Sequence, residues 1–235
     1  MNGSYVSETG HTDRLHEGRL LSIERIAADV GHAVRSPLQS LFINLEVLRR
    51  RVQNDARDEA LERTTVIENE ARRIADLIEA FMIVLRPAPA SAEVFDLDRA
   101  IDRIAPLLDV MARERRATFH RTSESVLVRA PEETLLYAIA RTAAAACDRT
   151  PPGGELRLSV EPGSAAVRVV VESSPETPDS AHPAAPASVT DLISFLARSD
   201  GTVALDAGSP TRGGGSFCFR VARADARLTE VSGSS

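Results

Sequence analysis

The sequence predicts an α+β protein: an antiparallel helical hairpin that forms a dimeric four-helix bundle, followed by an α/β sandwich. Two features of the 235 residues carry this prediction. Apolar residues repeat at helical spacing as far as the Pro- and Ala-rich segment at 86–92, and beyond it short apolar strands alternate with amphipathic helices. The predicted divisions are a disordered tail at 1–15, the hairpin at 16–86, the sandwich domain at 93–223 and a second tail at 224–235.

The first helix is expected at about residues 16–52, because its apolar residues follow a seven-residue repeat. Four of them share one position of the repeat: Ala27, Val34, Leu41 and Leu48. His32 then falls furthest from the apolar seam and faces water. Pro37 has no backbone N–H to donate and its ring crowds the preceding turn, so a kink or bulge is expected just after His32.

The second helix is expected at about residues 58–85, after a short polar turn at 53–55. Such a short connection makes the two helices antiparallel neighbours. Each helix has a wide apolar face, which a single hairpin cannot bury. We therefore expect two copies to pair as a homodimer through this hairpin.

The sandwich domain is expected to begin with a short extended piece around Phe95, after the stiff linker. Helices are predicted at 97–113, 131–148 and 189–198. Strands are predicted at 117–121, 126–129, 156–160, 166–172, 202–205 and 216–221. This order places helices on one side of a mixed sheet.

Composition narrows the class of protein. The chain has 28 basic and 34 acidic residues and a net charge of −6, which argues against a nucleic-acid binder. Cys147 and Cys218 lie in apolar surroundings without metal-binding spacing, as buried thiols in a reducing compartment do. No signal peptide or long apolar run is found, so we expect a cytoplasmic protein without a membrane partner.

Residues 32–38 read His-Ala-Val-Arg-Ser-Pro-Leu on the long amphipathic helix. This segment resembles the phospho-acceptor box of two-component histidine kinases. The hairpin resembles their dimerisation and phosphotransfer domain. The sandwich, with Thr-Pro-Pro-Gly-Gly at 150–154 and a glycine run at 213–215, resembles their GHKL-type ATP-binding domain. The resemblance implies that His32 is the phospho-acceptor, flanked by Arg35 and Ser36.

The ATP-binding elements of that family are missing here. The family has two asparagines on the helix before the Thr-Pro-x-Gly-Gly turn, and the second holds magnesium; this chain has Arg141 and Ala145 there. Segments 172–176 and 183–187 lack the glycines that approach adenine and phosphate, and the second has two prolines without an amide donor. We therefore expect a degenerate ATPase domain with no cofactor or metal of its own, and Mg²⁺ on the partner receiver domain.

Several residues near His32 are candidates for its chemistry and its partners. Arg35 is expected either to neutralise phosphate or to be an ordinary solvated side chain, and Asp29 is more simply a surface acid than a group that orients the imidazole. A receiver domain is expected to dock on the residues below His32, which are Gln39, Phe42 and Ile43. The alternative for Ile43 is packing against the second helix.

The resemblance and its departures predict a histidine phosphotransferase of a two-component phosphorelay, which passes a phosphoryl group between receiver aspartates through His32 without binding ATP. Ala33 agrees with this, because the family's acidic residue at that position supports attack on ATP. Partners would be response-regulator receiver domains, with a hybrid histidine kinase as a further candidate. Two alternatives remain: a non-catalytic pseudo-histidine-kinase that binds and regulates a receiver or kinase, and a divergent active kinase.

Overall fold

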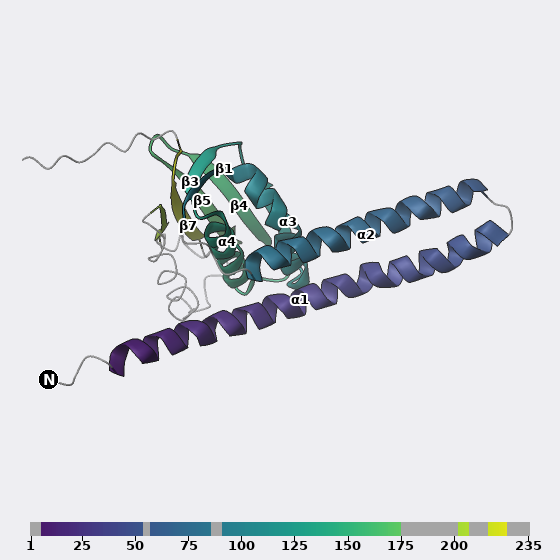
Figure 1. The fold of residues 1–235 in the computed structure, drawn as a ribbon, viewed down its shortest axis with the longest axis horizontal. Helices are drawn as coiled ribbons and strands as arrows, with labels where there is room; N and C mark the ends of the chain where they lie inside the picture. Colours follow the sequence, from purple (N-terminus) through teal and green to yellow (C-terminus); the bar gives the residue numbers. More distant parts are fainter. Residues whose placement is uncertain (1–5, 54–56, 86–90, 175–201, 207–215, 225–235) are drawn as a thin grey trace, which may run out of the picture.

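The computed structural model describes residues 6–53, 57–85, 91–174, 202–206 and 216–224, and places a long helical hairpin beside an α/β sandwich (Figure 1). The α+β class predicted from the sequence is confirmed. Several expected features lie outside the described residues: the helix at 189–198, the segment at 183–187, the glycine run at 213–215 and the tail from 225 on.

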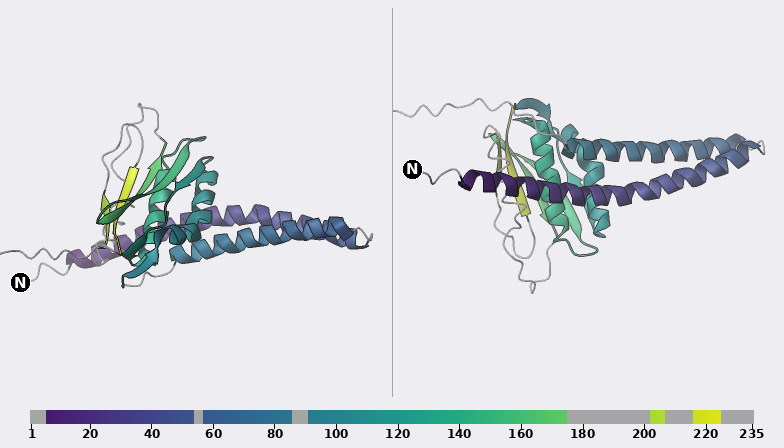
Figure 2. Two further views of the ribbon diagram at one scale, coloured as in Figure 1. Left: turned by 90° about the horizontal axis from the view of Figure 1, so that it is seen from above. Right: turned by 60° about the horizontal axis from the view of Figure 1, so that its bottom comes forward.

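The hairpin consists of α1 (Val6–Gln53) and α2 (Arg57–Leu85). Helix α1 begins well before residue 16, so from Val6 on the expected disordered tail is helical. Extension of a formed helix adds a hydrogen bond for each residue fixed, whereas the cost of nucleation arises only once. The bulge expected after His32 is absent, because α1 remains one α-helix through Pro37; Figure 2 shows it as one continuous helix that curves along its length.

A polar contact inside the hairpin fixes how its helices align. Asn44 of α1 is only 8% exposed. Its amide nitrogen donates to the carbonyl of Ser40 (2.8 Å), and its amide oxygen accepts from Nη1 of Arg63 on α2 (3.1 Å). A buried polar group that finds its partner in only one register disfavours slipped alignments of the two helices.

The sandwich follows the predicted order with boundaries that shift by a residue or two. Its helices are α3 (Leu97–Glu114) and α4 (Glu132–Cys147). Its strands are β1 (Glu93–Asp96), β2 (Thr118–Thr122), β3 (Leu127–Ala130), β4 (Glu155–Pro162), β5 (Ala166–Ser173), β6 (Val203–Asp206) and β7 (Ser216–Ala222). One sheet has the order β2-β4-β5-β7-β6, in which only β2 and β4 are parallel, and β1 pairs with β3 separately.

The starts of both sandwich helices follow from their sequences. Asp96 caps α3, since its carboxylate accepts from the backbone N–H groups of Asp98 (3.0 Å) and Arg99 (3.3 Å). Pro131 directly precedes α4. Proline is tolerated there because backbone N–H groups at the start of a helix have no acceptor within the helix.

The sandwich and the base of the hairpin share one hydrophobic core. Helices α3 and α4 contact the sheet and also contact α2. Ile26 and Val30 of α1 and Leu77 and Val84 of α2 are buried in the same cluster as the inner faces of α3 and α4. The far half of the hairpin projects beyond the sandwich, with both its flanks open (Figure 2). Within the described residues, no helix is long and apolar enough to cross a membrane.

Candidate functional site

His32 lies on the exposed side of α1, where the seven-residue repeat predicted it. It forms no hydrogen bond or ion pair with any residue that the structure describes. Residues on an α-helix advance by about 100° each, so Arg35 and Ser36 project within about 60° of His32 on the same flank. Both are exposed, and Arg35 has no acidic partner in the described part of the chain.

Asp29 is neither a free surface acid nor a partner of the imidazole. Both of its carboxylate oxygens accept from Nη1 of Arg115, at 3.0 Å each, and its side chain is only 14% exposed. Arg115 follows α3, so this ion pair joins the sandwich to α1 one turn before His32. The expectation that Asp29 is a plain surface acid is therefore wrong.

The three residues expected to dock a receiver all lie on the open part of α1 below His32. Phe42 is 70% exposed, Ile43 is 58% exposed, and Gln39 is also exposed. The alternative that Ile43 packs against α2 is not what the structure has. Their docking role stays a prediction.

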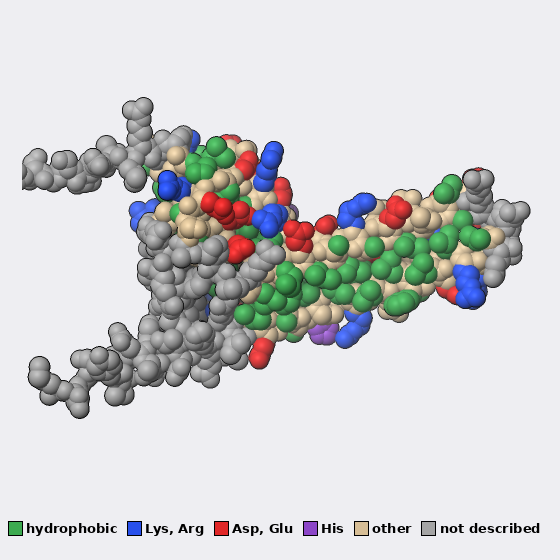
Figure 3. Space-filling model, viewed as in Figure 1, with side chains coloured by type: hydrophobic (Ala, Val, Ile, Leu, Met, Phe, Trp, Pro, Cys, Tyr) green, Lys and Arg blue, Asp and Glu red, His purple; other side chains and the backbone are tan. Residues whose placement is uncertain are grey.

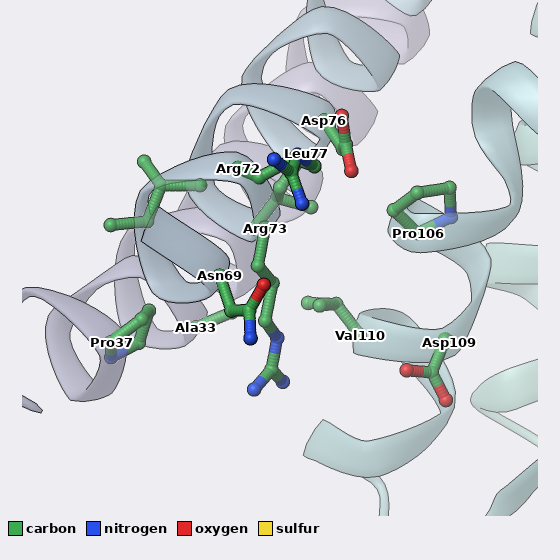
Figure 4. Close-up of a pocket in the computed structure, with 11 residues that line it drawn as sticks. Ala33, Pro37, Asn69, Arg72, Arg73, Asp76, Leu77, Pro106, Asp109 and Val110 are labelled. Atoms are coloured by element: carbon green, nitrogen blue, oxygen red, sulfur yellow. The ribbon is translucent and has the colours of Figure 1, made fainter. Parts of the chain in front are cut away.

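A cavity of about 280 Å³ lies between the hairpin and α3, next to the helix turn of His32 (Figure 4). Ala33 and Pro37 border it from α1, and Pro106 and Val110 border it from α3. Its polar lining comes mainly from α2 and includes Asn69, Arg72, Arg73 and Asp76. Neither Arg72 nor Arg73 forms an ion pair with a described residue, so both guanidinium groups are available to an acidic ligand or partner.

The hairpin also exposes a band of large apolar side chains, which Figure 3 shows in green along both helices. This apolar band consists of Leu38, Leu45 and Val52 of α1 and Leu61, Ile78 and Met82 of α2. The exposed fraction of these residues ranges from 40% to 64%. A contiguous apolar surface of this kind usually marks a protein interface.

Two positions of α4, Arg141 and Ala145, stand where the resemblance noted from the sequence would place magnesium-binding asparagines. Arg141 is 5% exposed, with its guanidinium carbon 5.9 Å from the centre of the Tyr137 ring, and Ala145 is 8% exposed. The Thr-Pro-Pro-Gly-Gly turn keeps its form, because the Thr150 hydroxyl donates to the carbonyl of Ala146 (2.9 Å) and Gly153 adopts φ +84°. The described residues contain no group of three or more His, Cys, Asp or Glu side chains that could hold a metal ion.

No protein-family model matches the sequence. Among solved structures, the Acinetobacter baumannii histidine kinase AdeS aligns with 83% of this chain and 98% of its own, at 13% identity and a TM-score of 0.47. A Burkholderia phymatum histidine kinase aligns with 86% of this chain and 98% of its own, at 15% identity and a TM-score of 0.46. A bacterial phosphotransferase aligns with 85% of this chain and 96% of its own, at 15% identity and a TM-score of 0.45.

Sequence reasoning missed Arg115, Arg72 and Arg73. The partner of Arg115 is 86 positions away, so no local pattern reveals it. Arg72 and Arg73 fall between the apolar positions of α2, where arginine is ordinary. Only the position of α3 turns this part of α2 into the wall of a cavity.

Proposed function

We propose that this chain is a histidine phosphotransferase of a two-component phosphorelay, and that His32 carries the phosphoryl group between receiver aspartates. The observation that carries the proposal is the exposed imidazole of His32, which has no partner among the described residues and stands on an open flank of a long helix. Imidazole is largely neutral at pH 7 and is then a competent nucleophile.

The transfer balances with groups that the two proteins supply. A ring nitrogen of His32 attacks the phosphorus of an aspartyl phosphate with its lone pair; the P–N bond forms, the P–O bond breaks, and the receiver's carboxylate leaves. The guanidinium of Arg35 would offset charge on the phosphoryl oxygens, and Mg²⁺ held by the receiver would add to this, because phosphoryl transfer depends mainly on positioning and charge neutralisation. Transfer to a second receiver reverses these bonds and restores the neutral imidazole.

The α4 helix supports transfer between receivers rather than from ATP. Magnesium binds to oxygen ligands. Arg141 places a cation, and Ala145 a methyl group, where the related kinases use amides. The protein should therefore act as a phosphotransfer protein with no nucleotide of its own.

The apolar band supports a homodimer, in which the bands of two hairpins pair into a four-helix bundle. The band lies on the side of α1 away from His32, so dimerisation would leave both histidines free. Arg35, Arg72 and Arg73 then offer positive charge to an acidic receiver surface, while Phe42 and Ile43 offer apolar contact.

Incubation with a panel of phosphorylated receivers tests the proposal. Label should move to this protein and be absent with His32→Gln. Binding of a receiver without label on His32 would favour the non-catalytic pseudo-histidine-kinase. Saturable heat on titration with Mg-ATP, together with label transferred from ATP, would favour the divergent kinase.

A further inference from the structure

Four charged residues join the sandwich to α1, and we call them the anchor cluster: Arg25, Asp29, Arg115 and Asp148. Besides the bonds from its Nη1 to both oxygens of Asp29, Arg115 places Nη2 3.6 Å from Oδ1 of Asp148. Arg25 pairs with both carboxylate oxygens of Asp148. Positive and negative groups therefore alternate from α1 to the end of α3, then to the end of α4 and back to α1.

The backbone fixes both sandwich members of the anchor cluster. Arg115 ends α3, and the next residue, Arg116, has φ +57°, a left-handed conformation that disfavours a side chain. The Arg116 carbonyl accepts from the N–H of Gly153 (2.8 Å), which ties this turn to the one after α4. Arg115 is thus held at its place by a turn that is itself costly to form.

Asp148 stands where its charge is unfavourable without the nearby cations, Arg25 of α1 and Arg115 of the sandwich. It follows the C-terminal end of α4, where the helix dipole repels a carboxylate. Burial raises the pKa of Asp148, against the attraction of Arg25 and Arg115. Burial also disfavours the charged form of Arg115, yet the hydrogen bonds and charge of Asp29 outweigh it and raise the Arg115 pKa. The sandwich therefore has an electrostatic reason to hold α1 at this turn.

The anchor cluster lies beside apolar contacts, which alone cannot fix how α1 is rotated about its axis. Ile26 and Val30 follow Arg25 and Asp29 directly, and they are 1% and 8% exposed in the shared core. Apolar contact is non-directional, whereas the hydrogen bonds from Nη1 of Arg115 to both oxygens of Asp29 depend on how α1 is rotated about its axis.

The helical turn that carries His32 lies between two groups of polar contacts that fix the position of α1. The anchor cluster precedes it by one turn, and the Asn44–Arg63 contact follows it. Between them, Pro37 removes the hydrogen bond that the Ala33 carbonyl would accept. The helix is thus weakest in its own hydrogen bonding at the turn where the imidazole must be placed.

We propose that the degenerate ATPase-like domain serves to hold the His32 turn of α1 in place, through Arg115 and Asp29 as positioning residues for phosphoryl transfer. This inference rests on the proposed function. It gives the sandwich a role that needs no nucleotide.

The experiment compares Arg115→Gln with Arg113→Gln in the full chain. Arg113 stands two residues earlier and pairs with Asp109 inside α3 (2.8 Å), so its loss removes an arginine–aspartate ion pair at the same end of α3 without touching α1. Amide hydrogen exchange over residues 25–36 should quicken about tenfold in Arg115→Gln and stay unchanged in Arg113→Gln. The rate at saturating phosphorylated receiver should fall about tenfold in Arg115→Gln alone, with KM unchanged, and Arg115→Lys should restore part of it.

The outcomes separate this inference from the proposed function. If exchange over residues 25–36 is unchanged in Arg115→Gln, or if it quickens while the saturated rate stays at the wild-type value, the positioning role is refuted. A rise in KM with an unchanged saturated rate would also refute it, because the residues would then act in docking. If the wild-type protein accepts no phosphate, the proposed function fails, while amide exchange still decides whether the anchor cluster orders the His32 turn.

Discussion

The apolar band and the flank of His32 lie on opposite sides of α1, so a charge placed on each should separate dimerisation from receiver docking. Leu45 belongs to the band, and Ile43 lies about three turns below His32. Two steps along an α-helix rotate a side chain by about 200°, so these two neighbours point in nearly opposite directions. We predict that Leu45→Asp separates the dimer, whereas Ile43→Asp leaves it intact and weakens transfer.

The size of the effect follows from exposure. Leu45 is 46% exposed in the single chain. Full burial of such a side chain contributes about 1.5–3 kcal/mol, so covering the exposed half contributes about 1 kcal/mol, or about 2 kcal/mol in a twofold dimer. Leu45→Ala should therefore weaken the dimer about 30-fold. Leu45→Asp should weaken it much further, because each buried, unpaired carboxylate costs several kcal/mol more.

Light scattering and sedimentation of the full chain over a wide concentration range measure the first effect. A Leu45→Asp protein with the wild-type dissociation constant, or an Ile43→Asp protein that becomes monomeric, would refute the assignment of the two faces. Transfer to Ile43→Asp should be slow at low receiver concentration and recover partly at high concentration. Its melting temperature should be unchanged, because Ile43 is 58% exposed; a lowered value would indicate packing instead.

Three further changes test the site and the fold. His32→Gln should keep the circular dichroism and melting curve of the wild type and accept no phosphate from a receiver, since the exposed imidazole has no packing role; label at the normal rate would exclude this residue. Arg73→Glu should weaken receiver binding, more at low salt than at high salt, because exposed charges are screened; an effect independent of salt would contradict an electrostatic role. Asp96→Ala should lower the free energy of unfolding by about 1 kcal/mol in urea. Hydrogen bonding from Ser125 lowers the Asp96 pKa, so this stabilisation should be present near neutral pH and disappear as pH falls through that lowered pKa.

The helices whose apolar residues recur at regular spacing could be predicted from the sequence. The seven-residue pattern gave the end of α1 and the whole of α2, and it placed His32 on the exposed side, because burial on a helix follows its period. The bulge expected at Pro37 is absent, since α1 stays one α-helix there, and the buried proline ring lines the cavity between α1, α2 and α3.

Contacts between residues far apart in the chain could not be predicted from the sequence. The parallel neighbours β2 and β4 are separated by β3 and α4, and no pattern in either strand specifies the other. Asp29 looked like an ordinary exposed acid because its partner Arg115 reaches it only when α3 packs on the hairpin. The candidate phospho-acceptor His32 could be proposed from a motif, whereas the ion pair between Asp29 and Arg115 could be seen only in the structure.

The labelling rate of the Cys147 thiol should report how often the sandwich separates from the hairpin. This residue ends α4 beside the anchor cluster, it is 1% exposed, and burial raises its pKa to about 12. The thiol therefore stays protonated near neutral pH, and the thiolate is the form that thiol reagents attack, so the docked protein should react with them slowly. A sandwich that swings away from α1 would bring water to this sulfur, whereas Cys218, buried in β7, would stay covered until the sheet itself opens. The ratio of the two labelling rates would therefore report how often the two parts come apart while each remains folded.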